Sequence, residues 1–294
     1  MKISHGFEFI GFWCLTKFVQ LIPGWMADKL AAGIGILSYH ILGSRRRIAI
    51  DNLTRAFSKD KSEIEIREIA REVFKTVARY TIDFSRNPVI AGGRLKSYVY
   101  EYSGFEYLTE ALKEGRGVVF ATAHFGNGEY MGGWLSAMGL PVDFVVGRQH
   151  NKHIDKMFSE LRKAHGVGII YANVSARHAI RALRDNRVIG LMADQHSASK
   201  GAIVNFFGRK AATPKGPASF CISNNCPMIF GVLIREKYNR YKILINPPIY
   251  PDSKADRKDD IVRILQEYTN QLEEIVRQYP EQWMWTHRRW KVDN

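Results

Sequence analysis

Short apolar runs alternate with amphipathic stretches through the middle of the chain. Apolar residues at 118–121, 142–146, 168–171 and 188–193 predict strands, and apolar positions spaced by three and four predict helices at 105–113, 152–165 and 175–185. This alternation predicts an α/β fold with a mixed, largely parallel central sheet flanked by helices. Later in the chain, runs at 228–234 and 241–245 flank the polar segment Arg235 to Arg240, which suits an antiparallel hairpin.

Three other segments complete the predicted elements. The aromatic and β-branched residues at 96–102 predict a strand, and the amphipathic pattern at 261–279 predicts a helix that ends before Pro280. The stretch at 197–215 is basic and contains glycine, and we interpret it as a loop region.

Two apolar runs at the N-terminus predict a pair of helices. They cover Phe9 to Ile22 and Leu30 to Gly43, and each falls short of the roughly 20 residues needed to cross a bilayer. Their many aromatic residues favour a helical pair lying on a membrane, with a single tilted span or a buried helical hairpin as alternatives. We therefore interpret 1–47 as a membrane-associated segment and 48–294 as one α/β domain with a helical lead-in over 48–95.

A cluster of basic residues follows these runs, and the whole chain is strongly basic. Arg45, Arg46 and Arg47 are placed to meet anionic headgroups on the cytoplasmic side of a membrane. The formal charge of +14 implies an anionic partner, which could be nucleic acid, phospholipid or an acidic carrier protein. The aromatic residues gather in apolar segments at both ends and do not interleave with basic residues, which disfavours a nucleic-acid binder.

A second basic group occurs on the helix predicted at 175–185. Arg177, Arg181 and Arg184 share one face of that helix, a pattern that suits contact with an acidic carrier or anionic lipid but is also typical of a solvated surface. The three cysteines include no CxxC pair, which predicts neither a disulfide framework nor a zinc site and favours a reducing compartment.

The candidate chemistry centres on the stretch from Gly117 to Trp134. His124 follows the predicted strand at 118–121, and Glu129 comes after a glycine-containing bend that leads toward a helix. If His124 lies in the loop and Glu129 in the first helical turn, the two side chains can converge. A neutral histidine can then take a proton from a substrate hydroxyl while the carboxylate holds its other nitrogen. The alternative is a histidine that only caps the following helix.

Two more polar residues follow predicted strands. Arg148 trails the strand at 142–146, and Asp194 directly follows the strand at 188–193, so the ends of three strands supply a base, a cation and a carboxylate. We expect Arg148 and Asp194 to bind substrate, and Arg148 or the backbone amides around Gly126 and Asn127 to stabilise an oxyanion. Structural roles in an ion pair or a loop brace are the alternatives. The sequence contains no GxSxG, Walker-type GxxxxGK, HExxH or complete GxGxxG motif.

Several blocks of sequence together resemble one family. They are the basic segment RRRIAIDNLTRAF at 45–57, HFGNGE at 124–129, the arginine at 148, GLMADQ at 190–195, FFGRKAATPKGPA at 206–218 and PEQWMWTHRRWK at 280–291. Their order and spacing resemble the bacterial lipid A biosynthesis acyltransferases, which include lauroyl and myristoyl transferases.

The resemblance implies a glycerolipid acyltransferase-like fold on the cytoplasmic face of the inner membrane. It implies that an acyl chain moves from a thioester, usually on acyl carrier protein and otherwise on coenzyme A, to a hydroxyl of a lipid precursor in the membrane. It also implies His124 as the general base and Glu129 as the residue that orients it. No metal or cofactor is implied.

Two departures from the family pattern leave the acceptor open. The family commonly has tryptophan where this chain has Gly128, and proline where it has Gln149. The acceptor is therefore a lipid A precursor, another glycolipid or an aminolipid. A non-catalytic lipid-binding protein of the same fold is the alternative from a different class.

Overall fold

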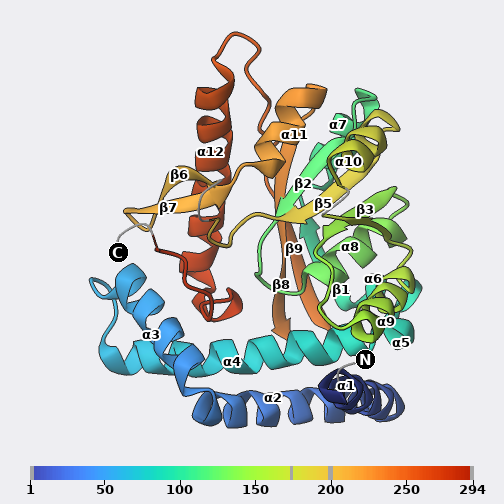
Figure 1. Cartoon of the computed structure of the whole chain (residues 1–294), viewed down its shortest axis with the longest axis vertical. Coiled ribbons are helices and arrows are strands. Elements are labelled where there is room, and N and C mark those ends of the chain that lie inside the picture. The colour runs from blue at the N-terminus through green and yellow to red at the C-terminus, as the bar shows by residue number, and fades with distance from the viewer. Residues whose placement is uncertain (1–2, 173–174, 198–200, 292–294) are drawn as a thin grey trace.

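The computed structural model describes residues 3–172, 175–197 and 201–291. Its centre is a seven-stranded sheet with helices on both faces, and a layer of N-terminal helices crosses one end of the strands (Figure 1). The strand order is β1-β9-β8-β2-β5-β3-β4. The strands are β1 (Val99–Ser103), β2 (Val118–Thr122), β3 (Val142–Val146), β4 (Gly168–Tyr171), β5 (Val188–Met192), β8 (Met228–Lys237) and β9 (Arg240–Ile245).

The prediction of a mixed, largely parallel sheet is confirmed. Strand β2 runs parallel to both of its neighbours, β5 and β8, and β3 runs parallel to β5 and β4. The predicted hairpin is the one antiparallel pair in this sheet as the structure describes it, formed by β8 and β9. Because parallel strands end at the same edge, the carboxyl ends of β2, β5 and β3 lie together.

The central strand, β2, is buried at every position because both of its faces are covered. Val119 and Ala121 join the core on one face, and Val118 and Phe120 join the core on the other. The first core includes residues from α10 (Ser175–Arg184), α11 (Gly216–Asn224) and α12 (Arg257–Gln278), and the second includes residues from α6 (Gly93–Tyr98), α7 (Phe105–Lys113) and α8 (Gly128–Ala137).

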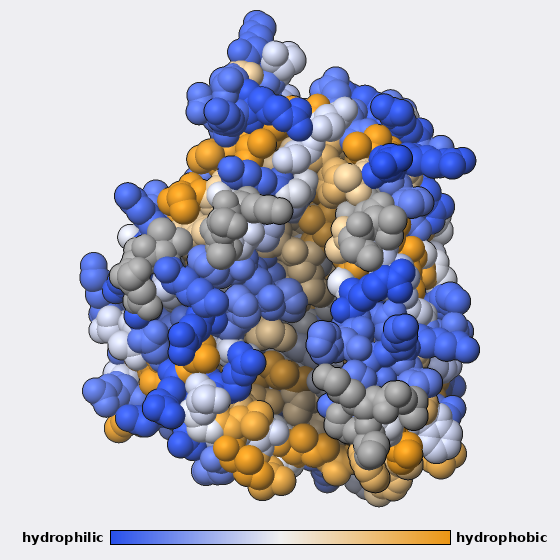
Figure 2. All heavy atoms as spheres, in the orientation of Figure 1, coloured by the Kyte–Doolittle hydropathy of each residue, from blue (hydrophilic) through white to orange (hydrophobic). Residues whose placement is uncertain are grey.

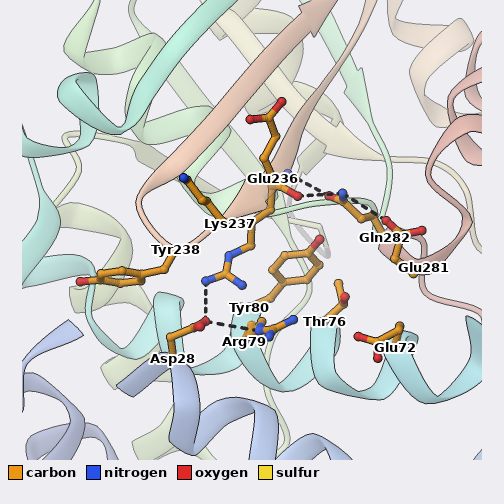
Figure 3. A pocket seen from close by; sticks show the side chains of 11 residues that line it. Asp28, Glu72, Thr76, Arg79, Tyr80, Glu236, Lys237, Tyr238, Glu281 and Gln282 are labelled. Atoms are coloured by element: carbon orange, nitrogen blue, oxygen red, sulfur yellow. Dashed lines mark hydrogen bonds and ion pairs between the residues drawn. The ribbon is translucent and has the colours of Figure 1, made fainter. Parts of the chain in front are cut away.

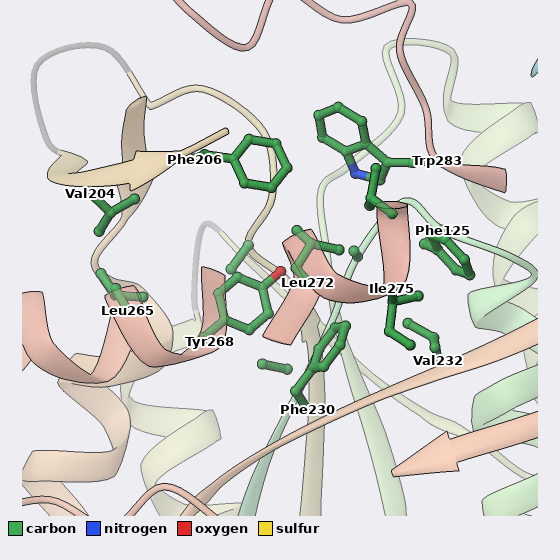
Figure 4. Close-up of a cluster of buried hydrophobic side chains, with 14 of the residues drawn as sticks. Phe125, Val204, Phe206, Phe230, Val232, Leu265, Tyr268, Leu272, Ile275 and Trp283 are labelled. Atoms are coloured by element: carbon green, nitrogen blue, oxygen red, sulfur yellow. The ribbon is translucent and has the colours of Figure 1, made fainter. Parts of the chain in front are cut away.

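Aromatic side chains fill the core beside the end of β2 (Figure 4). The rings of Phe206 and Trp283 lie 5.3 Å apart, and those of Phe230 and Tyr268 lie 5.4 Å apart, both near edge-to-face. The Tyr268 hydroxyl donates to the carbonyl of Thr122 at 2.9 Å, so α12 holds the last residue of β2 in place.

The N-terminal layer contains the two predicted apolar helices. They are α1 (Ile3–Leu21) and α2 (Gly24–Ile41), and they are followed by α3 (Gly43–Phe57), α4 (Glu63–Ser85) and α5 (Asn87–Ile90). Helix α2 lies close against α4 through Ala27, Ala31 and Gly35. A Cβ atom at Gly35 would lie 2.4 Å from the Cα atom of Lys75, so only glycine permits this approach.

The outward faces of α1 and α2 carry exposed apolar side chains. The most exposed are Leu21 at 84%, Phe7 at 73% and Ile41 at 67%. Figure 2 shows these apolar side chains along the edge of the molecule where Figure 1 places α1 and α2. We call this surface the apolar helix face; its members include Phe7, Ile10, Trp13, Phe18, Leu21, Trp25, Met26, Leu37, Ile41 and Leu42.

In the part of the chain that the structure describes, none of the helices is both long enough and apolar enough to span a membrane.

The loop predicted at 197–215 is wrong for most of its length. Residues Gly201–Phe206 (β6) and Arg209–Pro214 (β7) form a separate antiparallel hairpin, while 198–200 lie outside the described residues. Alternate residues Ala202, Val204 and Phe206 are buried, which is the period of a strand with one covered face. Phe207 and Gly208 at the turn both have positive φ, as tight two-residue hairpins require.

Several predicted boundaries differ from the structure, among them those of β1 and α12. The segment at 96–102 is divided, because α6 extends to Tyr98 before β1 begins at Val99. The last long helix begins at Arg257, four residues before the predicted start at Ile261, because the Asp256 side chain accepts the N–H of Lys258 and caps it. Neither difference changes the order of the predicted strands, because each affects only where one element begins.

Candidate functional site

The carboxyl ends of β2 and β5 place His124 next to Asp194. Thr122 and Met192 are paired at the ends of these two parallel strands, and His124 and Asp194 each follow two residues later. Their side chains meet with His124 Nδ1 at 2.8 Å from Asp194 Oδ1. The strand-end rule therefore correctly brought these two residues to one edge, although the sequence analysis assigned the histidine a different partner.

Three hydrogen bonds hold the Asp194 carboxylate in a buried position. Besides the His124 ring, the backbone N–H of His124 donates to Oδ2 at 2.9 Å, and Trp283 Nε1 donates to the same oxygen at 2.8 Å. Asp194 is only 2% exposed. A buried carboxylate with this many donors is fixed in orientation, so it fixes the orientation of the His124 ring as well.

The pair influences the protonation of both residues. Burial by itself lowers the pKa of His124, but attraction to the Asp194 carboxylate and their hydrogen bond outweigh burial and raise it. Burial by itself raises the pKa of Asp194, but the charge of His124 and the hydrogen bonds from His124 and Trp283 lower it. Asp194 is therefore the ionised member of the pair, and His124 is the member that takes up and releases a proton.

The second nitrogen of His124 faces the side-chain amide of Gln195. Gln195 Nε2 lies 3.2 Å from His124 Nε2. An amide NH₂ only donates and an ionised carboxylate only accepts, so this arrangement requires the neutral tautomer with its proton on Nδ1. The lone pair on Nε2 is then available to any hydroxyl that replaces the Gln195 amide.

The segment that follows α12 braces the loop carrying His124. Met284 N–H donates to the carbonyl of His124 at 2.9 Å, and Gly126 N–H donates to the carbonyl of Gln282 at 3.1 Å. Gly126 has a φ of +54°, and a Cβ atom there would lie 1.7 Å from the carbonyl oxygen of Leu233. The bend therefore requires glycine, and the N–H of Gly126 is already occupied, which excludes it as an oxyanion donor in this arrangement.

Glu129 lies in the first turn of α8, as expected, but its carboxylate binds another residue. Arg162 of α9 (Lys152–Lys163) donates to it through Nη2 at 2.8 Å and through Nε at 3.0 and 3.2 Å. The expected contact between Glu129 and His124 is therefore replaced by two separate pairs, His124 with Asp194 and Glu129 with Arg162. The physical reason is the start of α8, which points Glu129 toward α9 while the β2–β5 edge supplies Asp194.

The first turn of α8 offers hydrogen-bond donors near His124. Asn127 caps the helix by accepting the N–H of Tyr130 at 3.1 Å, and its own side-chain NH₂ is buried without a partner among the described residues. The backbone N–H groups of Gly128 and Glu129 also have no acceptor among the described residues. A helix N-terminus with unpaired N–H groups favours negative charge.

Two cavities meet at His124. The larger, of about 330 Å³, is lined by residues at the ends of β2, β3 and β5 together with Arg148 and Arg162. The smaller, of about 130 Å³, lies between α4 and the segment after α12 and includes Val77, Tyr80 and Met284. Both cavities share the residues His124, Gly128, Glu129 and Met192.

Arg148 lies at the mouth of the larger cavity. Its side chain is exposed, and its guanidinium group is 4.2 Å from the centre of the Tyr171 ring. A cation stacked on an aromatic ring keeps its charge and its remaining donors free for a ligand. The structure thus places Arg148 beside the His124 site, as the strand-end rule predicts.

The other predicted arginines lie elsewhere. Arg45 and Arg47 are exposed on α3, and Arg46 stacks on Tyr39. Arg177, Arg181 and Arg184 are exposed along α10, which runs back toward the start of β5, so they do not converge on His124.

The tryptophans near the C-terminus are packing residues, and a neighbouring arginine is buried with them. Trp283, Trp285 and Trp290 are at most 4% exposed. Arg289 is 2% exposed and donates to the carbonyl of Ala212 and to Thr213, so it is not free to contact a lipid headgroup.

Three residues of the site were not singled out from the sequence. Gln195 follows Asp194 directly, and the sequence signal that could have identified it is its place in the GLMADQ block. Trp283 and Arg162 lie far along the chain from the groups they hold. Trp283 falls in the PEQWMWTHRRWK block, which was its available signal, whereas nothing in the local sequence of Arg162 distinguishes it from a surface residue.

The fold and the site together define an α/β protein with a histidine–aspartate pair at the carboxyl edge of its parallel strands. A family model of the bacterial lipid A biosynthesis acyltransferases matches residues 3–292, so the chain belongs to that family and is an acyltransferase.

The relatives are named either as phosphatidylinositol mannoside acyltransferases or as lipid A biosynthesis acyltransferases. The chain is 26% identical over 246 residues to a phosphatidylinositol mannoside acyltransferase of Mycolicibacterium smegmatis, which covers 82% of this chain and 78% of the relative. It is 24% identical over 287 residues to a lipid A biosynthesis palmitoleoyltransferase of Escherichia coli, covering 96% and 90%. A lipid A biosynthesis lauroyltransferase of Escherichia coli is 23% identical over 286 residues, again covering 96% and 90%.

Proposed function

We propose that this protein transfers a fatty acyl chain from a thioester, on acyl carrier protein or coenzyme A, to a hydroxyl of a glycolipid acceptor in a membrane. The observation that carries the proposal is the contact of His124 Nδ1 with the buried Asp194 carboxylate, which leaves Nε2 facing the Gln195 side chain. The family and the names of its members support acyl transfer to a glycolipid. A lipid A precursor is one such acceptor, and a different glycolipid or an aminolipid is the alternative.

The acceptor hydroxyl replaces the Gln195 amide at His124 Nε2. As its oxygen bonds to the thioester carbonyl carbon, its proton passes to Nε2, and Asp194 stabilises the imidazolium that forms. The tetrahedral intermediate then breaks its carbon–sulfur bond, and His124 returns the proton to the departing sulfur. The products are an ester and a free thiol, and the histidine is neutral again.

The negative charge on the intermediate has candidate partners on two sides. The unpaired N–H groups of Gly128 and Glu129 and the side-chain NH₂ of Asn127 lie at the start of α8, and Arg148 lies across the larger cavity. Donors held in place before reaction are effective because they need no rearrangement as charge develops. Gly126 is not among these donors, because its N–H already donates to the carbonyl of Gln282.

His124→Ala tests the mechanism in purified, membrane-reconstituted protein. General acid–base catalysis contributes about 10² to 10⁴-fold, so we expect kcat for acyl transfer to fall by that amount. The melting temperature and vesicle binding serve as controls for folding. Activity near the wild-type level would sink the mechanism.

We also propose that residues 1–47 hold the protein on the cytoplasmic face of the inner membrane through the apolar helix face. Ten large apolar side chains exposed on adjoining helices exceed what a solvated surface normally carries. Helix α4, which supports α2, supplies Val77 and Tyr80 to the smaller cavity, so a lipid bound at this face is close to His124. Arg45 and Arg47 then lie where anionic headgroups are found.

Leu21→Glu tests this placement by flotation with anionic vesicles. Full burial of a leucine stabilises by about 1.5 to 3 kcal/mol, so we expect vesicle affinity to fall by at least about tenfold. Val262→Glu is the matched control, because Val262 is 41% exposed on α12, away from the apolar helix face. Equal binding by the two variants would overturn the proposal.

Gly128 is a candidate determinant of which substrates fit. A Cβ atom at this position would lie 2.8 Å from Cε of Met192, and both residues line both cavities. We expect Gly128→Trp to displace the flexible Met192 side chain and to narrow the range of acyl chains or acceptors, measured by mass spectrometry of products. An unchanged product profile would count against this role.

The second departure from the family pattern has a visible consequence. The backbone N–H of Gln149 donates to Asp155 Oδ1 at 2.8 Å. A proline at this position has no N–H and loses that bond. The loop that carries Arg148 is therefore attached to α9 in a way that the usual family residue does not permit.

A further inference from the structure

A separate polar cavity lies next to the reaction site. It measures about 310 Å³ and lies between α2, α4, the end of β8 and the segment after α12 (Figure 3). Because β8 runs parallel to β2, the end of β8 lies at the same edge of the sheet as His124. The lining residues are Asp28, Glu72, Thr76, Arg79, Tyr80, Arg235, Glu236, Lys237, Tyr238, Glu281 and Gln282.

Two arginines in this cavity share one carboxylate oxygen. Arg235 Nη2 donates to Asp28 Oδ1 at 2.6 Å, and Arg79 Nε lies 3.3 Å from the same oxygen. The Arg235 side chain is only 7% exposed. The Nε groups of both arginines lack a well-formed hydrogen bond within the described residues, so each leaves an unsatisfied donor at this cavity.

Tyr80 adds another unsatisfied group and connects the cavity to the reaction site. Its hydroxyl is buried with no partner among the residues that the structure describes. Tyr80 and Gln282 line both this cavity and the smaller cavity at His124, so the two spaces are neighbours with a common wall. A buried polar group without a partner costs about 1 to 3 kcal/mol, and a ligand that supplies acceptors removes that cost.

The charges of the cavity favour hydroxyl groups over a fully ionised ligand. Glu236 is bound to Arg240 and Tyr100, and Glu72 to Lys75, so two of the carboxylates at the rim already have partners. Glu281, which accepts one long hydrogen bond from Gln282 at 3.5 Å, and Lys237 lie beside the arginines as a further acceptor and a further donor. A hydroxyl both donates and accepts, so a ring with several hydroxyls matches this mixed set, whereas an acyl chain satisfies none of it.

We propose that the polar cavity binds a sugar or cyclitol ring of the acceptor's headgroup, so that a neighbouring hydroxyl reaches His124 past Tyr80 and Gln282. This inference rests on the proposed function, since it names the part of the acceptor that the enzyme recognises. The volume of about 310 Å³ falls at the lower end of the range for ligand pockets, which is about 300 to 1,000 Å³. It admits a single ring, and the lipid tails then extend toward the apolar helix face.

Tyr80→Phe tests the proposal by removing one hydroxyl and little else. One hydrogen bond contributes about 0.5 to 1.5 kcal/mol, so we expect KM for a glycolipid acceptor to rise about threefold to tenfold. The acceptor is whichever of a phosphatidylinositol mannoside and a lipid A precursor the wild type acylates. KM for the acyl donor and the melting temperature stay at wild-type values. Tyr107→Phe on α7 is the matched control, because Tyr107 lies outside this cavity.

Direct binding provides a second measurement that does not depend on turnover. Saturation-transfer NMR with methyl α-D-mannopyranoside and with myo-inositol is expected to show contact with the wild type and Tyr107→Phe, and weakened contact with Tyr80→Phe. The inference is overturned if Tyr80→Phe matches Tyr107→Phe in both measurements, or if KM for the donor rises as much as KM for the acceptor. Absence of acyl transfer by the wild type refutes the proposed function instead, and the NMR comparison then decides the sugar site by itself.

Discussion

Two histidines of this protein, one partly buried and one buried, have pKa values shifted in opposite directions. His124, at the carboxyl edge of the sheet, has a raised pKa because Asp194 holds one of its nitrogens. His165, in the turn between α9 and β4, is 6% exposed, and neither of its nitrogens has a partner among the described residues. Burial without a compensating charge lowers the pKa of His165 to about 4.

The comparison shows that a fixed carboxylate beside the ring raises the pKa of a histidine, whereas burial by itself lowers it. His165 lies against the Tyr130 ring, with ring centres 5.8 Å apart, and remains neutral throughout the physiological range. His124 has the same side chain, but Asp194, two residues past the end of β5, holds its Nδ1 and raises its pKa. The following experiments remove or add the features that distinguish the two.

Asp194→Asn makes His124 resemble His165, and we expect the largest effect of the set. Asparagine removes the charge and can donate its NH₂ to Nδ1, which moves the proton to Nε2 and abolishes the base. We expect kcat to fall by about 10² to 10⁴-fold. The residual activity should also decline at a lower pH than in the wild type, so its acid limb shifts to lower pH. The reason is that the attraction that raises the pKa of His124 is lost.

The measurement is the pH dependence of kcat/KM for wild type and variant. In the wild type, activity requires neutral His124, so it rises with pH through a pKa above the ordinary value of 6.5. An acid limb that stays in place after Asp194→Asn would show that another group sets it.

His165→Leu removes the second histidine, and its effect appears in stability. The folded-state pKa of about 4 lies below the unfolded value of about 6.5, so the unfolded chain binds more protons between these pH values. The native state is therefore fully stabilised above pH 6.5 and loses about 3 kcal/mol as the pH falls toward 4.

Urea unfolding at pH 7 and pH 4.5 measures this loss. We expect the decline in the free energy of unfolding between the two pH values to be smaller in His165→Leu than in the wild type. Other titrating groups are common to both proteins, so they cancel in the difference. Equal declines would mean that His165 finds a partner in solution.

Glu129→Gln tests a carboxylate that lies near His124 but binds elsewhere, and we expect the smallest effect. The variant keeps a hydrogen bond to Arg162 but loses the charge of a pair whose side chains are only 20% and 13% exposed. A charge-assisted hydrogen bond is worth about 1.5 to 3 kcal/mol more than none, so partial loss should lower kcat/KM by about tenfold. The position of the acid limb should not change.

The contrast between Glu129→Gln and Asp194→Asn is the decisive observation. If Glu129→Gln moves the acid limb as far as Asp194→Asn does, then Glu129 reaches His124 during turnover and the assignment of partners seen here is wrong. Arg162→Lys provides a control, since it preserves the charge but cannot form the two-nitrogen contact with Glu129.

Much of the fold could be predicted because its signals are local. The strands at 142–146 and 168–171 and the helix at 105–113 have the predicted bounds, since apolar runs and helical spacing act within a few residues. The hairpin of β6 and β7 was missed because the basic residues at its turn obscured the alternation of Ala202, Val204 and Phe206. That alternation has meaning only once α12 supplies the surface that buries it.

The candidate site was predictable in part for the same reason. The strand-end rule placed His124, Arg148 and Asp194 at one edge because it depends only on which segments are parallel strands. It could not choose the partner of His124, because Glu129 is five residues away in sequence and Asp194 is seventy. Proximity in sequence favoured the wrong pair.

The sequence by itself determined that a histidine, an arginine and an aspartate follow apolar strands, that two apolar helices begin the chain, and that the family motifs occur in order. Only the tertiary structure decided that β5 lies beside β2, which gives His124 its carboxylate, and that α9 takes Glu129 away with Arg162. The same folding placed the unsatisfied groups of Arg235 and Tyr80 beside the reaction site. Strand order and helix packing are set by the burial of whole faces, and no short stretch of sequence contains that information.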